Sequence, residues 1–163
     1  MASINGIQLK GVKTFVGREG DFCQGNVYVD GKKVGFWSED GDGGCDFFDF
    51  DEKKYDERVQ NFKDSLIDYP YINYVDFSAV LGAIMLLNSI EKDAKKHFKN
   101  GVKAIIASVD KYHARLYFSK EDASDEELKK KCKELLGHET VFRSLDDFNV
   151  KVDKFNRMEI LDA

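Results

Sequence analysis

The ionisable side chains most able to do chemistry are concentrated in one segment, which begins just after Trp37. Seven acids and no base lie between Ser38 and Glu52: Glu39, Asp40, Asp42, Asp46, Asp49, Asp51 and Glu52. So many like charges in a short span repel one another unless a cation or a basic partner shares the space. The chemistry indicated for this acidic stretch, residues 39–52, is therefore binding, either of a divalent cation or of a positively charged surface.

A cation site is the first alternative. Asp40, Asp42 and Asp46 stand among glycines and resemble the start of a calcium-binding turn. The match is incomplete when the loop is counted from Asp40. Its fifth position is Gly44 where a third Asp or Asn is expected, and the turn glycine is expected one residue later. Its twelfth position is Asp51 rather than Glu. A structural or hydrolytic divalent cation held by Asp40, Asp42 and Asp46 is possible, and no other cofactor is expected.

A docking surface is the second alternative. Carboxylates at alternate positions of a strand lie about 6.6 Å apart, which is similar to the spacing of phosphates along a nucleic-acid strand, so an acidic strand can take the place of a phosphate backbone. Neighbouring aromatic residues, Trp37, Phe47 and Phe48, would turn electrostatic attraction into affinity. The predicted partner-binding residues are Trp37, Glu39, Asp40, Asp42, Asp46, Phe47, Asp49 and Asp51. A third interpretation is a solvated turn followed by the polar face of a strand.

Elsewhere the chain has few signs of catalysis. His97, His113 and His138 fit surface or capping positions, and zinc ligands from Cys45, Cys132 or His138 lack the short spacing of structural sites. Cys45 lies among carboxylates that disfavour its thiolate. The P-loop, GxGxxG, GxSxG and HExxH motifs do not occur in the sequence. These observations make an enzyme the less expected class.

Composition limits the setting and the partners. A chain of 163 residues that is 42% hydrophobic fits a single domain, residues 1–163. The formal charge of −5 argues against direct binding of nucleic acid and for a basic protein surface as partner. No apolar run approaches membrane-spanning length, the amino terminus lacks a signal-peptide pattern, and three scattered cysteines suit a reducing compartment. We expect a cytoplasmic protein without membrane contact, whose oligomeric state the sequence leaves open.

An antiparallel β-meander is expected to hold the acidic stretch. The apolar pattern of residues 7–16 changes phase at Gly11, which indicates a strand with a β-bulge. Asp30 and Gly31 separate two alternating runs, the strongest short-range signal for a hairpin. Residues 46–50 should form a fourth strand, with Phe48 and Phe50 on one face and Asp49 on the other.

Helices and shorter strands are expected to follow. Apolar spacing predicts a helix over 55–66, a packed loop or edge strand over 68–75, and a longer helix over 77–99 that begins after Asp76 and ends before Gly101. A hairpin is expected over 102–118 across Asp110 and Lys111. A capping box at Ser124 starts a third helix that should run to Gly137. Short strands are expected over 139–143 and in the tail, although the tail also fits a helix. The fold class is α+β.

Residues 24–44, continuing to Asp46 and Phe48, resemble the amino-terminal module of small uncharacterised bacterial and prophage proteins. Small acidic proteins of mobile elements are similar in kind to phage inhibitors such as anti-CRISPR proteins, many of which occupy basic nucleic-acid channels. The resemblance implies a non-enzymatic inhibitor that docks the acidic stretch onto a nucleic-acid-binding effector. The alternative is a divalent-metal-binding domain built on the same acids.

Overall fold

The computed structural model describes residues 1–17, 20–41, 46–50, 77–109, 114–132, 135 and 138–150. Its contacts group into two compact units, Ser3–Ile84 and Met1–Ala2 together with Met85–Ala163. The α+β class is confirmed. The helix expected over 55–66 and the segment expected over 68–75 lie outside the described residues, and the assignment of residues 1–163 to one domain stays a prediction.

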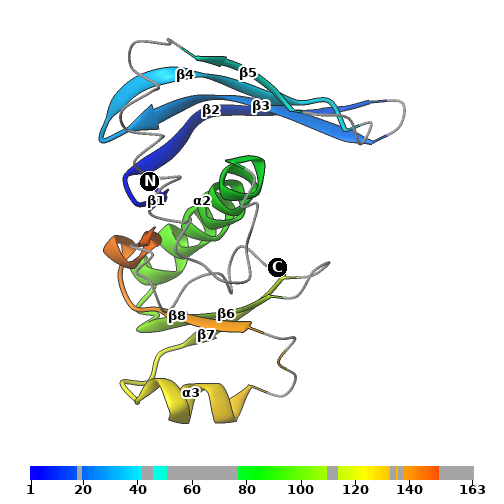
Figure 1. Cartoon of the computed structure of the whole chain (residues 1–163). Coiled ribbons are helices and arrows are strands. Elements are labelled where there is room, and N and C mark those ends of the chain that lie inside the picture. Colours follow the sequence, from blue (N-terminus) through cyan, green and yellow to red (C-terminus); the bar gives the residue numbers. More distant parts are fainter. Residues whose placement is uncertain are drawn as a thin grey trace, which may run out of the picture. The chain divides into compact units, whose positions relative to one another are not determined.

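The unit Ser3–Ile84 is built on an antiparallel meander, the blue and cyan strands of Figure 1. Its strands are neighbours in the order β5-β4-β3-β2-β1. Their bounds are Ser3–Ile4 (β1), Ile7–Val16 (β2), Asp21–Val29 (β3), Lys32–Glu39 (β4) and Phe47–Phe50 (β5). The predicted meander is therefore confirmed, and the strand expected over 46–50 is present as β5.

Local sequence signals determine the turns of this sheet. Asp30 and Gly31 both have positive φ, 47° and 77°, as the two-residue hairpin turn between β3 and β4 requires. Gly11 has φ 64°, and the register of β2 against β3 shifts between Lys10 and Lys13. Two residues of β2 thus oppose one residue of β3, which is the predicted glycine bulge.

The sheet has one buried face. Leu9, Cys23, Val27 and Trp37 alternate with more exposed neighbours and are each at most 5% exposed. In the same unit, the first turns of α2 (Phe77–Lys99) contribute fully buried Val80, Leu81 and Ile84. Apolar side chains at alternate strand positions and at helical spacing therefore supply the core of this unit.

Helix α2 matches the predicted span and ends where glycine was expected to end it. Gly101 has φ 83°, its N–H bonds to the Phe98 carbonyl at 3.1 Å, and the Val102 N–H bonds to the His97 carbonyl at 3.2 Å. This is the Schellman arrangement, in which a left-handed glycine allows the last carbonyls to be capped.

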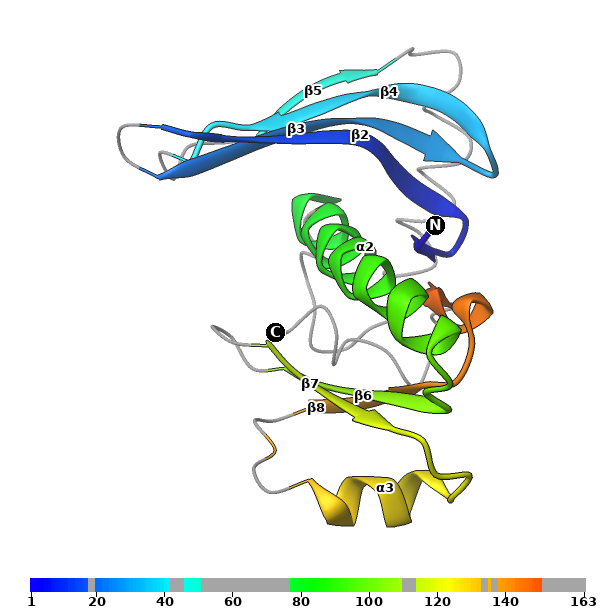
Figure 2. The same cartoon turned by 180° about the vertical axis from the view of Figure 1, so that it is seen from behind.

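The second unit contains a three-stranded sheet, β6 (Ala104–Val109), β7 (Ala114–Ser119) and β8 (His138–Phe142), with β6 in the centre. On one face Ala104 and Ile106 form a cluster with Leu128 of α3 (Asp125–Lys131), and both views show this helix along the sheet (Figures 1 and 2). On the opposite face His97 of α2 stacks on Phe118. Ile105 and Ala107 of β6 lie on this second face and are buried, so both faces of β6 are covered. The hairpin predicted across Asp110 and Lys111 is confirmed as the antiparallel pairing of β6 with β7, which begins at Val109 and Ala114. Residues 110–113, which include the predicted turn, lie outside the described part.

One prediction for the later chain was wrong in extent, and the predicted strands of the tail are tested only up to residue 150. Helix α3 ends at Lys131 rather than Gly137, because Cys132 is already extended and its N–H bonds to the Lys129 carbonyl. The chain must then return to pair β8 with β6, a long-range requirement that local helix signals do not contain. The tail begins with a 3₁₀ turn, η1 (Leu145–Phe148), and only then forms a short strand, β9 (Asn149–Val150).

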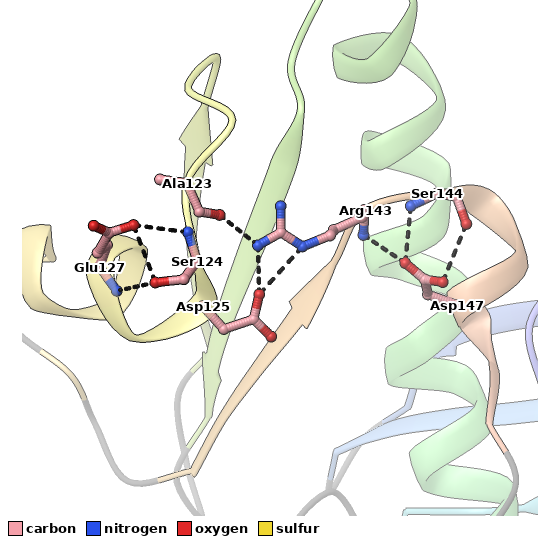
Figure 3. Close-up of polar contacts among 7 residues, drawn as sticks. All are labelled: Ala123, Ser124, Asp125, Glu127, Arg143, Ser144 and Asp147. Carbon is pink, nitrogen blue, oxygen red and sulfur yellow. Dashed lines mark hydrogen bonds and ion pairs between the residues drawn. The ribbon is translucent and has the colours of Figure 1, made fainter.

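Arg143 connects the elements at this end of the second unit (Figure 3). Its guanidinium donates to Asp125 Oδ1 and to the Ala123 carbonyl at 2.5 and 2.7 Å, and its backbone N–H donates to Asp147. Ser124 and Glu127 form the predicted capping box beside it. These contacts fix the start of α3 against the end of β8.

None of the helices in the described part of the chain combines the length and the apolar character needed to cross a membrane.

Candidate functional site: the acidic stretch and the outer face of the sheet

The structure describes only part of the acidic stretch. Glu39 ends β4, Asp40 follows it, Asp46 precedes β5, and Asp49 lies within β5. Asp42 and Asp51 lie outside the described residues, as do Cys45 and Glu52. The structure therefore brings four of the acids to the β4 and β5 side of one sheet.

Trp37 is not an exposed surface anchor, and the expectation that it contacts a partner stays a prediction. Its side chain is 2% exposed and belongs to the buried face of the sheet. The indole N–H donates to Asp46 Oδ2 at 2.5 Å, which satisfies the only polar group of a buried tryptophan. Asp46 therefore has an internal role, because it holds the segment before β5 against β4.

Glu39 also has an internal partner. The Cys23 thiol donates to Glu39 Oε2 at 3.4 Å from the neighbouring strand. Burial, this hydrogen bond, and the negative charges of Glu39 and Asp46 raise the pKa of the Cys23 thiol to about 12. A thiol held neutral by this environment cannot act as a nucleophile near neutral pH.

Phe47 and Asp49 point to the side of the sheet opposite Trp37. Strand β5 alternates exposed Phe47 and Asp49 with half-buried Phe48 and Phe50, whose rings stack 5.5 Å apart. Phe47 is 60% exposed, and Phe15 of β2 is 39% exposed, so both rings are accessible to a partner. An exposed aromatic ring beside a carboxylate is the best-formed part of the predicted partner-binding site.

The same side of the sheet carries aromatic residues that the sequence analysis did not single out. Cross-strand partners share a face, so the register places the following residues together on what we call the outer face: Gln8, Lys10, Lys13, Phe15, Phe22, Gln24, Asn26, Tyr28, Lys33, Phe36, Ser38, Phe47 and Asp49. Phe15 stacks on Phe22 at 4.8 Å, and Lys10 Nζ lies 4.4 Å from the centre of the Tyr28 ring. The sequence contains a sign of this face on β3 and β4, because Phe22, Tyr28 and Phe36 each stand next to a core residue of the same strand.

The metal alternative stays untested at its centre, because Asp42 lies outside the described residues. Within the described part of the chain, histidine, cysteine and acidic side chains form no group of three that could hold a metal ion. Asp46 already accepts the Trp37 indole N–H. Asp40 and Asp46 alone do not form a cation site.

Glu91 is the buried acid that most resembles a catalytic group, and its contacts explain it structurally. It is 3% exposed, yet it accepts from the Ala2 N–H at 2.9 Å and pairs with Lys95 Nζ at 3.0 Å and the Met1 amino group at 2.7 Å. Burial raises the pKa of Glu91, but the hydrogen bonds and positive charges of its partners together lower it by more, so the net shift is downward. A carboxylate held ionised by three donors is a poor general acid.

The chain matches no protein-family model, no curated protein and no solved structure.

Proposed function

We propose that this chain is a non-enzymatic protein-binding module that uses Phe47 and the neighbouring acids to engage a basic surface of another protein. The observation that carries the proposal is the arrangement of β5, where a 60% exposed phenylalanine and an exposed aspartate share one face of an ordered strand. Strand β4 holds this pair in place through a continuous register from Gly35 to Ser38.

The two residues support binding in different ways. Removing an exposed phenylalanine side chain from water contributes about 2 kcal/mol or more, the size expected of an interface anchor. Asp49 and Asp40 add attraction for a positive surface, which raises association rates and selects the partner more than it adds affinity. An anchor within a charged border is typical of protein interfaces.

The partner class follows from charge and spacing. Asp49 and Asp51 stand at alternate positions in the sequence, although Asp51 lies outside the described residues. Carboxylates spaced in this way along a strand would present negative charge at intervals similar to those of phosphates, so a groove that binds nucleic acid is the basic surface they would fit best. The chain would then act as an anti-CRISPR-type inhibitor that occupies the nucleic-acid site of an effector.

A comparison of immobilised variants tests the proposal. The edge variant carries Asp40→Asn, Phe47→Ser and Asp49→Asn, and the matched control carries Asp122→Asn, Glu126→Gln and Leu145→Ser at other exposed positions. We expect wild type and control to retain the same basic protein from a host lysate, identified by mass spectrometry, and the edge variant to lose it. Equal retention by the edge variant would show that this surface is not the docking site.

A further inference from the structure

The outer face of the sheet has an ordered separation of charge. One cross-strand row runs Lys10, Asn26, Phe36, Asp49, and the next runs Lys13, Gln24, Ser38, Phe47. Lysines therefore lie on β2 and the aspartate on β5, three strand spacings or about 14 Å apart. Lys33, the remaining lysine of this face, lies at the start of β4 opposite Tyr28.

Aromatic rings fill the positions between and beyond these charges. Phe47 and Phe15 are 60% and 39% exposed, while Phe22, Tyr28 and Phe36 are partly exposed. A sheet face with this much aromatic surface marks an interaction site rather than a face adapted to water alone. The polar residues between the rings suit an interface that forms and separates rather than a permanent one.

We propose that the outer face is self-complementary and joins two copies of this chain in a two-fold symmetric dimer. If the two-fold axis runs along the strands, β2 of each copy lies over β5 of the other. Lys10 of one copy then faces Asp49 of its partner, the reciprocal pair forms by symmetry, and Lys13 lies over Phe47. Sheets that pack face to face keep their strands within about 30° of each other and lie about 10 Å apart, which this arrangement allows.

Charge selects this orientation and this occupant. A two-fold axis perpendicular to the strands would place Lys10 against Lys10 and Asp49 against Asp49, which is repulsive. A polyanion such as nucleic acid would meet Asp49, and a uniformly basic partner that covered the whole outer face, rather than its β5 side alone, would also meet Lys10 and Lys13. A second copy offers an opposite charge to both Lys10 and Asp49, the two ends of the row, at the same time.

This inference rests on the same residues, Phe47 and Asp49, as the proposed function, and adds that a second copy competes with the basic partner for them. The two proposals can be separated, because Lys10 is required only for self-association. The four strands form a face about 20 Å wide, which places the interface at the small end of specific interfaces and predicts a weak, concentration-dependent dimer.

Sedimentation equilibrium over a wide concentration range tests the pairing with four proteins: wild type, Lys10→Asp, Asp49→Lys, and the double variant with both changes. Each single variant makes both symmetric contacts repulsive, and we expect its dimerisation to be at least about tenfold weaker. Mixing the two single variants should restore a heterodimer, since each contact then joins opposite charges, and the double variant should form homodimers. Lys32→Glu, an exposed lysine that pairs with buried-face Val29, is the control with no expected effect.

Each outcome of this experiment either supports or overturns the proposed dimer. A wild-type chain that stays monomeric up to millimolar concentration would overturn the proposal, and so would single variants that dimerise as tightly as wild type. Weakened single variants whose mixture and double variant both stay monomeric would overturn the Lys10 to Asp49 pairing. Rescue in the mixture supports it. Circular dichroism of each variant confirms folding, and Lys13→Asp offers a second charge change on the same strand.

Discussion

At the scale of residues, Cys23 shows how the acidic stretch affects the interior of the sheet. Its thiol is 5% exposed and donates to Glu39. Its pKa of about 12 lies well above the ordinary pKa of a cysteine thiol, so between these values the folded state keeps the proton that the unfolded state loses. Any stability that depends on this group is complete below about pH 9 and falls as the pH rises toward 12.

We therefore predict that Cys23 in the folded protein resists alkylation at pH 8 and that wild type loses stability between pH 9 and 12. The measurement is iodoacetamide labelling followed by peptide mass spectrometry, with denatured protein as the reference, and urea unfolding across the pH range. Cys23→Ala should lose less stability over the same interval. Rapid labelling of native Cys23 would contradict the assigned hydrogen bond and burial.

Trp37 and Phe47 define what the sequence could and could not show about the site. Both lie near the acidic stretch, and both were expected to be anchors. Only the pairing of β4 with β5 decides between them, because the register places Trp37 with Phe48 on one face and Ser38 with Phe47 on the other. The sequence indicates the candidate segment, but the face on which each aromatic side chain lies depends on strand register.

At the scale of elements, Gly35 controls how β5 joins the sheet. A side chain at Gly35 would collide with the Phe50 ring and would lie 2.6 Å from the Asp49 carbonyl oxygen and 2.9 Å from the Phe50 Cα. Since two of these atoms belong to the backbone of β5, the strand itself would have to move.

We predict that Gly35→Ala destabilises the protein by about 1–3 kcal/mol through this overpacking. Amide hydrogen exchange should also increase at 47–50, because β5 loses its register against β4. Gly82→Ala is the control, since nothing lies within 4 Å of the added methyl group and the site is exposed in α2. The control should gain about 0.5–1 kcal/mol from helix propensity. Unchanged stability and exchange in Gly35→Ala would show that β5 is not held this closely.

The capping box at the start of α3 gives a second prediction for an element. Glu127 N–H donates to Ser124 Oγ at 3.3 Å, and Ser124 N–H donates to Glu127 Oε2 at 2.9 Å. Ser124→Ala should lower the free energy of unfolding by about 1 kcal/mol. Urea denaturation monitored by circular dichroism measures the change. Ser89→Ala, on the exposed side of α2, should have no such cost, and equal effects at the two serines would contradict the cap.

Local signals predicted most of these elements correctly. The Asp30 and Gly31 turn, the Gly11 bulge, the glycine end of α2 and the Ser124 cap depend on residues that are neighbours in sequence, so their chemistry can be read directly. The end of α3 and the start of the tail depend instead on β8 returning to β6. This long-range pairing outweighs the local preference for a helix at residue 132. No short sequence motif predicts such a pairing.

At the scale of the molecule, charge is arranged by region rather than spread evenly. Residues 38–52 hold seven acids and no base, whereas the C-terminal half of α2 presents exposed lysines at 92, 95, 96 and 99. The formal charge of −5 is thus the sum of segments with opposite charge. If the proposed function holds, partner choice depends on the local surface, which for the N-terminal sheet is the group of acids beside Phe47.

The most direct test of this account measures the affinity of the captured basic partner for single variants at two salt concentrations. We predict that Phe47→Ser weakens binding by at least about tenfold at both, as expected for a buried anchor. Asp49→Asn should weaken binding less, and its effect should shrink at high salt, as expected for a screened charge. If Phe47→Ser binds as tightly as wild type, the exposed edge of the sheet is not the docking surface.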